Sequence, residues 1–161
     1  MKIRDLMTKQ VASVRATDST AVAARLMWDC DCGAVPVLDE DGRVIAMITD
    51  RDICMAALMR DRPPSAIPVL EVMSRELQTC EPDDNVTAAE QMMRAHQVRR
   101  IPIVDRERRL LGMLSLADIV RAADHNKRRG ARPIASDEVA GTLADICAAP
   151  GREATPQPAA Y

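Results

Sequence analysis

Two short motifs place a hydroxyl three residues before a carboxylate. They are Thr49-x-x-Asp52 and Ser115-x-x-Asp118, and each lies where an apolar stretch gives way to a helical pattern. The first amides of a helix have no intrahelical partners, so they attract anions and polar ligands. A hydroxyl and a carboxylate at that point can bind a sugar diol or a phosphate, but the same spacing is that of a helix-capping box. The pattern alone leaves both roles open.

A pair of arginines could supply the charge that a phosphate requires. Arg99 and Arg100 come just before an apolar strand pattern in the second half of the chain. A guanidinium can hold a phosphate through two hydrogen bonds, whereas arginines at the end of a helix are also stable in solvent, facing the helix dipole. The equivalent residues of the first half, Gly33 and Ala34, carry no charge, which predicts two unequal sites.

An internal repeat explains why the motif occurs twice. Shifting residues 3–57 forward by 66 positions superposes both copies of the motif without a gap, and it carries Val35-Pro36-Val37 onto Ile101-Pro102-Ile103. Each copy follows the order strand, helix, strand, strand, helix. The expected elements are strands 11–14, 77–80, 34–38 and 44–48, helices opening at 17–18 and 83–84 with Asp18 and Asp84 as caps, and helices 50–59 and 116–124.

The repeat also sets the expected domain boundaries. Repeat one covers residues 1–60, an extended proline-rich linker covers 61–68, and repeat two covers 69–125. Residues 126–161 are expected to form a mobile tail with a short helix at 137–148. The first helix of each repeat should bury an apolar stripe, formed by Val22, Leu26 and Met27 in repeat one and by Ala89, Met92 and Met93 in repeat two.

Composition excludes several classes of function. The 161 residues are 47% hydrophobic with a net charge of −2, and they include no Phe, one Trp and one Tyr. Few aromatic rings and no overall basic field count against nucleic-acid binding, although residues 94–132 are locally basic. The sequence has no apolar run long enough for a membrane span and no signal-peptide pattern, which predicts a cytoplasmic protein whose five cysteines are free thiols.

The two repeats closely resemble a tandem pair of CBS domains, also called a Bateman module. The resemblance rests on an apolar-Pro-apolar strand followed by Ile-Thr-Asp-Arg-Asp-Ile at 48–53 and by Leu-Ser-Leu-Ala-Asp-Ile at 114–119, and it covers residues 3–123. The chain looks most like small stand-alone bacterial CBS proteins of the hypoxic-response or stress type. The resemblance implies an α+β fold in which two β-α-β-β-α repeats pack about a pseudo-twofold axis through their sheets, with two clefts, and it implies a homodimer.

The resemblance also implies the ligand and its contacts. CBS pairs bind AMP, ADP, ATP or an adenosyl compound, with an aspartate on the ribose, a hydroxyl on ribose or phosphate, and an apolar strand against the adenine. Family geometry suggests that Arg99 and Arg100 serve the cleft of Asp52, which would leave the cleft of Asp118 weaker. The candidate ligand-binding residues are Thr49, Arg51, Asp52, Val35, Pro36, Arg99, Arg100, Ile101, Pro102, Ser115 and Asp118.

The function that follows is a non-catalytic regulatory module that binds an adenine nucleotide and signals to an unidentified partner protein. No set of base, nucleophile and oxyanion donors can be assembled, so we assign no catalytic residue, metal site or cofactor. One alternative is a dimerisation scaffold with empty clefts. Another is a redox or metal sensor built on Cys30 and Cys32, with His96 as a further ligand.

Overall fold

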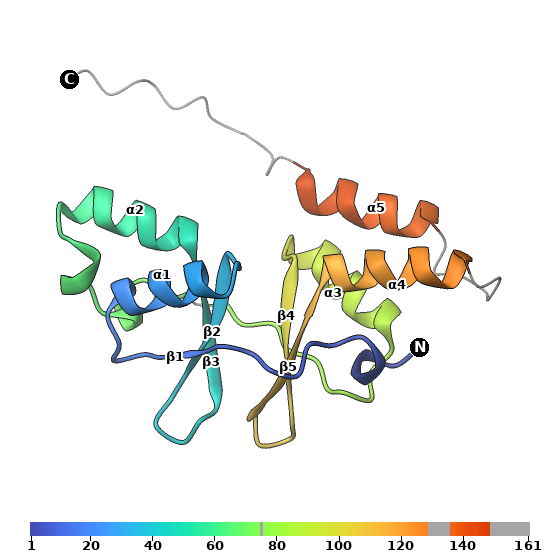
Figure 1. The fold of residues 1–161 in the computed structure, drawn as a ribbon, viewed down its shortest axis with the longest axis horizontal. Coiled ribbons are helices and arrows are strands. Elements are labelled where there is room, and N and C mark those ends of the chain that lie inside the picture. Colours follow the sequence, from blue (N-terminus) through green and yellow to red (C-terminus); the bar gives the residue numbers. More distant parts are fainter. Residues whose placement is uncertain (75, 129–135, 149–161) are drawn as a thin grey trace.

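The computed structural model describes residues 1–74, 76–128 and 136–148. Repeat one holds a three-stranded sheet in the order β1-β2-β3, and repeat two holds the two-stranded sheet β4-β5 (Figure 1). The elements of repeat one are β1 (Val14–Arg15), α1 (Thr20–Asp29), β2 (Ala34–Leu38), β3 (Val44–Thr49) and α2 (Asp50–Arg60). Those of repeat two are α3 (Val86–His96), β4 (Arg100–Val104), β5 (Leu110–Ser115) and α4 (Leu116–Arg128), followed by α5 (Ser136–Cys147).

The two repeats exchange their leading segments. Ile3, in the short 3-10 helix η1 (Ile3–Asp5), lies in the core of repeat two, and Val69, in η3 (Val69–Glu71), lies in the core of repeat one. Equivalent backbone hydrogen bonds hold the two segments in place. Ile3 N donates to Asp84 O at 3.0 Å, and Val69 N donates to Asp18 O at 2.8 Å. Figure 1 shows the N-terminal segment starting beside repeat two and crossing to repeat one. Each repeat therefore completes the core of the other.

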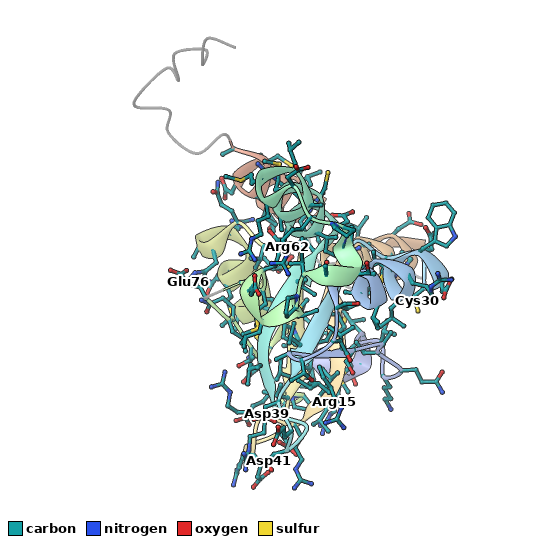
Figure 2. The ribbon with its side chains drawn as sticks, turned by 90° about the vertical axis from the view of Figure 1, so that its left-hand side faces the viewer. Arg15, Cys30, Asp39, Asp41, Arg62 and Glu76 are labelled. Atoms are coloured by element: carbon teal, nitrogen blue, oxygen red, sulfur yellow. The ribbon has the colours of Figure 1, made fainter. Side chains whose placement is uncertain are left out.

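The hairpins also join the repeats. Val44 N donates to Arg108 O at 2.9 Å, and Arg43 and Arg109 form an antiparallel bridge. Asp39 and Asp41 mark the free end of the first hairpin in Figure 2. Gly42 has the positive φ that its turn requires, and Arg108, which replaces it in repeat two, adopts the same left-handed backbone at φ 65°.

The first strand of each repeat is shorter than the sequence predicts. Strand 11–14 was expected, but β1 is only Val14–Arg15, paired in parallel with Val37 and Leu38 of β2. The expected strand 77–80 reduces to a single bridge between Cys80 and Ile103. The cause is the exchange of segments: the chain leading into β1 first pairs with repeat two, where Thr8 bridges Met113.

The predicted caps of the first helices are wrong. Helix α1 begins after Ser19 and α3 after Asn85, neither of which makes a side-chain cap hydrogen bond. The Asp18 carboxylate instead accepts from Arg15 N at 2.7 Å, and Asp84 accepts from Glu81 N at 2.8 Å. These aspartates close the turn before the helix.

The buried stripe of α1 also differs from the prediction. It passes through Ala23 and Met27, which leaves Val22 half exposed at 50%. Val22 is one residue from Ala23, so it points about 100° away around the helix. Ala89 and Met93 occupy the same two positions in α3 and are fully buried.

The linker and the tail are more structured than expected. Within the expected extended linker, residues 64–66 form the 3-10 helix η2 (Pro64–Ala66), and Ile67 is fully buried. Helix α4 runs to Arg128, past the expected end of repeat two. Helix α5 lies where a short helix was predicted at 137–148, but it packs on α3 and is not a free tail, because Ile146 joins the core of repeat two (Figure 1). Residues 149–161 of the predicted tail lie outside the described residues.

Candidate functional site

Both hydroxyl-carboxylate motifs form capping boxes. Thr49 has extended backbone at φ −116°, and its hydroxyl accepts from Asp52 N at 3.2 Å while Asp52 Oδ2 accepts from Thr49 N at 3.0 Å. The Thr49 hydroxyl also donates to the same Asp52 oxygen at 2.7 Å. Ser115 and Asp118 repeat this geometry, with the backbone bond to Asp118 Oδ2 at 2.8 Å and the hydroxyl bond at 2.6 Å. In each box the Oδ2 atom of the aspartate makes the cap, which leaves its Oδ1 atom for a second contact.

The second carboxylate oxygen distinguishes the two motifs. Asp118 Oδ1 forms an ion pair with the guanidinium of Arg121, one turn further along α4. The Asp118 side chain is 11% exposed and that of Arg121 is 71% exposed, so the pair lies at the surface of a hollow. Asp52 Oδ1 makes no hydrogen bond or ion pair within the part of the chain that the structure describes.

Strand register places the arginine next to the second motif. Arg100 pairs directly with Ser115 across β4 and β5, and the equivalent pair in repeat one is Ala34 with Thr49. Directly opposed residues of an antiparallel pair have Cβ atoms only about 5 Å apart on one face of the sheet. Arg100 therefore lies beside Ser115, while the equivalent position beside Thr49 has only a methyl group.

The Asp118 motif opens into a pocket of about 400 Å³ to which both repeats contribute. Carboxylate, hydroxyl and guanidinium groups line it together with small apolar side chains. The lining residues are Thr8, Gln10, Val11, Ala12, Cys30, Asp31, Cys32, Ala34, Val35, Arg100, Met113, Ser115, Ala117, Asp118 and Arg121. A mixed lining of this kind suits a small ligand with an apolar part and an anionic part.

The structure places Arg99 and Arg100 on the side of the second motif, whereas which cleft they serve stays a prediction. Arg100 lines the Asp118 pocket, and both arginines line an adjoining pocket of about 590 Å³ that includes Ser115 and Arg121. The reason is the pairing of Arg100 with Ser115 within one sheet.

The remaining candidates divide between surface and core. Arg51 is exposed on α2, and Val35 lines the Asp118 pocket although it is 1% exposed. Pro36, Ile101 and Pro102 are buried. Sequence reasoning missed Arg121, which lies three residues after Asp118; that spacing on a helix indicates an ion pair.

Two of the five cysteines lie in the same pocket. Cys30 is exposed and Cys32 half buried, and Figure 2 shows Cys30 at the outer edge of the molecule. In the described ranges no three or more His, Cys, Asp or Glu side chains gather in a metal-binding group. Cys80 differs, because burial and the nearby Asp84 carboxylate raise the pKa of its thiol to about 11.

Comparison with known proteins identifies the family. The CBS domain model matches residues 3–59 and 69–125, and the chain belongs to this family as a tandem pair of CBS domains. CBS pairs are regulatory modules. The chain is 39% identical over 128 residues to the CBS domain-containing protein YhcV of Bacillus subtilis, which covers 80% of this chain and 89% of that protein. It is 32% identical over 118 residues to Hypoxic response protein 1 of Mycobacterium tuberculosis, covering 73% and 82% of the two chains.

Solved structures agree with the fold. A crystal structure of Hypoxic Response Protein I with two coordinated zinc ions superposes with a TM-score of 0.69 at 31% identity, covering 75% of this chain and 98% of that one. The CBS domain pair of protein MJ0100, in complex with 5′-methylthioadenosine and S-adenosyl-L-methionine, superposes with a TM-score of 0.67 at 26% identity, covering 75% and 94%. The predicted α+β fold of two CBS repeats is confirmed.

Among the described residues, none of the helices is long and apolar enough to cross a bilayer.

Proposed function

We propose that this CBS pair binds a phosphorylated adenosine ligand, such as AMP or ATP, in the Asp118 pocket and signals occupancy to a partner protein. The observation that carries the proposal is the convergence of a carboxylate, a hydroxyl and two arginines in one pocket between the repeats. The complex of the MJ0100 pair with two adenosyl compounds supports an adenosine-type ligand. Those compounds carry no phosphate, so the phosphate preference rests on the arginines of this chain.

Each part of the ligand has a counterpart in the pocket. The ribose diol would donate to Asp118 Oδ1, replacing Arg121, while Oδ2 keeps the helix cap. A charge-assisted bond from a hydroxyl to a carboxylate is stronger than a neutral one. The released Arg121, together with Arg100, would then contact the phosphate, and Val11, Ala12 and Val35 would pack against the base.

The Asp52 site would bind a different ligand or bind more weakly. Its Oδ1 atom is available without breaking an ion pair, but Ala34 stands where repeat two has Arg100. This site therefore favours an adenosyl compound without phosphate. The two clefts would report on two ligand classes.

Signalling follows from the position of the pocket between the repeats. The lining residues from Thr8 to Val35 come from the first half of the sequence, whereas those from Arg100 to Arg121 come from the second. A ligand that contacts both halves stabilises one relative orientation, and only such differential binding can shift an equilibrium. In a homodimer, that shift would alter the contact between subunits, which a partner protein could recognise.

Isothermal titration of the ligand-stripped protein with AMP, ATP, adenosine and S-adenosylmethionine tests the proposal. Arg100→Ala should weaken AMP binding by about 10- to 100-fold, since a hydrogen bond to a charged group contributes about 1.5–3 kcal/mol, and should leave adenosine binding within about twofold. Asp118→Asn, which retains size and some capping ability, should weaken all ligands at this site. Asp52→Asn is the matched control and should leave AMP binding unchanged.

Three outcomes would contradict the proposal. The absence of heat and of thermal stabilisation with all four ligands would favour the scaffold alternative. Loss of AMP binding in Asp52→Asn alone would locate the site in the other cleft. Stoichiometric zinc that depends on Cys30 and Cys32, with no nucleotide affinity, would favour the metal-sensor alternative.

A further inference from the structure

Two thiols in the wall of the Asp118 pocket have no role in the function proposed above. Cys30 is exposed and Cys32 is half buried, and both line this pocket. The equivalent residues of repeat two are His96 and Val98, neither of which carries a thiol. The pair is therefore a feature of repeat one and not of the repeated unit.

The backbone between the two cysteines is folded into a tight turn. Asp31, which separates them, has a φ of 48° in the left-handed region, and Gln97 at the equivalent position of repeat two has a φ of 52°. The Cys32 amide donates to the carbonyl of Met27 at 2.9 Å, which ties the end of the turn to the last turn of α1. Because both repeats have the same turn, its shape belongs to the fold and does not depend on the flanking thiols.

This turn sets the spacing of the two cysteine Cα atoms. The left-handed region is the mirror image of the right-handed helix, in which residues two apart have Cα atoms about 5.4 Å from each other, given a radius of about 2.3 Å and a rise of about 1.5 Å per residue. Disulfides join residues whose Cα atoms are about 4.4–6.8 Å apart. An extended chain would separate the same atoms by about 7 Å, at the edge of that range. The conformation of Asp31 thus places Cys30 and Cys32 within disulfide reach.

We infer that Cys30 and Cys32 form a redox-active pair, which a small peroxide oxidises to a disulfide in the wall of the Asp118 pocket. The exposed Cys30 gives up its proton and its sulfur attacks one peroxide oxygen, so that the O–O bond breaks, one water leaves and a sulfenic acid forms. The Cys32 sulfur then attacks the Cys30 sulfur, the S–O bond breaks and a second water leaves. In total the two thiols lose two electrons and two protons, and hydrogen peroxide is reduced to two molecules of water.

The disulfide would act directly on the ligand pocket. Cys30, Asp31 and Cys32 line it together with Arg100 and Asp118. A bond between the two sulfur atoms turns both side chains toward each other and changes the wall against which a ligand packs. This effect on binding rests on the function proposed above, whereas formation of the disulfide does not.

A third thiol is the competing partner for Cys32. Cys54, on α2, is exposed, and together with Cys32 it lines a groove of about 440 Å³ between α1 and α2. A bond between these two residues would have to join two elements across that groove, whereas the turn at Asp31 already sets the spacing of Cys30 and Cys32. The pair separated by one residue is therefore favoured.

Peptide mapping of the full-length protein tests the inference. The protein is treated with a small excess of hydrogen peroxide, alkylated with iodoacetamide, digested with trypsin and analysed by mass spectrometry with fragmentation. The tryptic peptide 26–43 contains Cys30 and Cys32 and no other cysteine. It should lose two hydrogen atoms and take up no alkyl group, and it should take up two alkyl groups after reduction with dithiothreitol. Cys54, alone in peptide 52–60, is the internal control and should gain oxygen instead.

Cys32→Val is the matched variant, because repeat two has Val98 at the equivalent position. Without the second thiol, Cys30 should continue to the sulfinic acid and gain two oxygen atoms. Isothermal titration with AMP then compares the reduced and the oxidised protein of native sequence. Oxidation should weaken AMP binding by about fivefold or more, and dithiothreitol should restore it.

Two results of the peptide map would overturn the inference. One is the addition of oxygen to Cys30 in the native sequence without loss of hydrogen from the peptide. The other is a cross-link of peptide 26–43 to the peptide of Cys54 or to its own copy from a second chain. An AMP affinity that the disulfide leaves unchanged would overturn its effect on the ligand. The map needs no nucleotide, so failure of the proposed function is distinguishable from failure of the redox pair.

Discussion

At the scale of single residues, Asp52 and Asp118 use only one of their two carboxylate oxygens for capping. One oxygen of each carboxylate closes a capping box, a contact worth about 1 kcal/mol to the helix, and the other oxygen points away from it. Capping and ligand binding are therefore not exclusive alternatives for these residues. The neighbouring residues create the difference, because Arg121 reaches Asp118 Oδ1 and no described residue reaches Asp52 Oδ1.

Cys80 provides a prediction at this scale. Burial, aided by Asp84, raises the pKa of its thiol from 9.0 to about 11, so the thiolate is disfavoured in the folded protein. At pH 8 the exposed Cys30 and Cys54 should react with a thiol reagent well before Cys80, which should react only after unfolding. Mass spectrometry of partially modified protein measures the order, and equally fast modification of Cys80 would contradict the assignment.

The same pKa shift predicts the pH dependence of stability. Because the folded pKa lies above the unfolded value, the contribution of the Cys80 thiol to stability is fully present below pH 9.0 and is lost as the pH rises toward about 11. Urea denaturation at pH 8 and pH 10.5 should show a smaller pH-dependent loss in Cys80→Ala than in the unmodified chain.

At the scale of elements, the contact between the N-terminal segment and β5 explains why position 112 is a glycine. The N-terminal segment pairs with β5 through two hydrogen bonds between Thr8 and Met113, both 2.9 Å long. Gly112 lies directly beneath this contact. A Cβ atom on Gly112 would lie 2.8 Å from the carbonyl oxygen of Thr8, closer than real Cβ atoms approach backbone.

Gly112→Ala should therefore lower the free energy of unfolding by about 1–3 kcal/mol, the usual cost of overpacking. Gly33→Ala is the matched control, because its Cβ would meet only the Asp50 carboxylate, 2.9 Å away, and that side chain can rotate. Chemical denaturation of both variants measures the difference. An equal loss in the two variants would indicate a general effect of replacing glycine.

At the scale of the whole molecule, the two repeats form one structural unit. Ile3 belongs by sequence to repeat one but lies in the core of repeat two, and Val69 does the reverse. Neither repeat can complete its core without the other. A ligand that alters one repeat would consequently act on both, as a regulatory module requires.

Cooperative unfolding tests this coupling. Ile3→Ala should destabilise the protein by about 2–5 kcal/mol, because it leaves a cavity in a fully buried site. The transition followed by Trp28 fluorescence in repeat one should shift together with the helical circular dichroism of the whole chain. Leu70→Ala, at a residue that is 59% exposed, serves as the control. A Trp28 transition that stays in place while the circular dichroism signal splits would show independent repeats.

The sequence by itself determined the features that depend on short separations. The capping boxes span three residues, the hairpins β2–β3 and β4–β5 connect neighbouring strands, and the 66-residue repeat is visible without any structure. The family resemblance extended these features to the fold, which the comparisons confirm. Local hydrogen bonds and apolar periodicity suffice for such predictions because both partners lie close together in the chain.

Only the tertiary structure decided which distant segments meet. It placed Arg100 beside Ser115 and Asp118 rather than beside Asp52, and it seated α5 on repeat two. It also exchanged the leading segments, and β1 is shorter than predicted. Asp18 accepts a hydrogen bond from Arg15 N and does not cap α1. These outcomes depend on which apolar surfaces bury one another. Because the two repeats share one pattern of strands and helices, each segment has two similar partners that local pattern cannot distinguish.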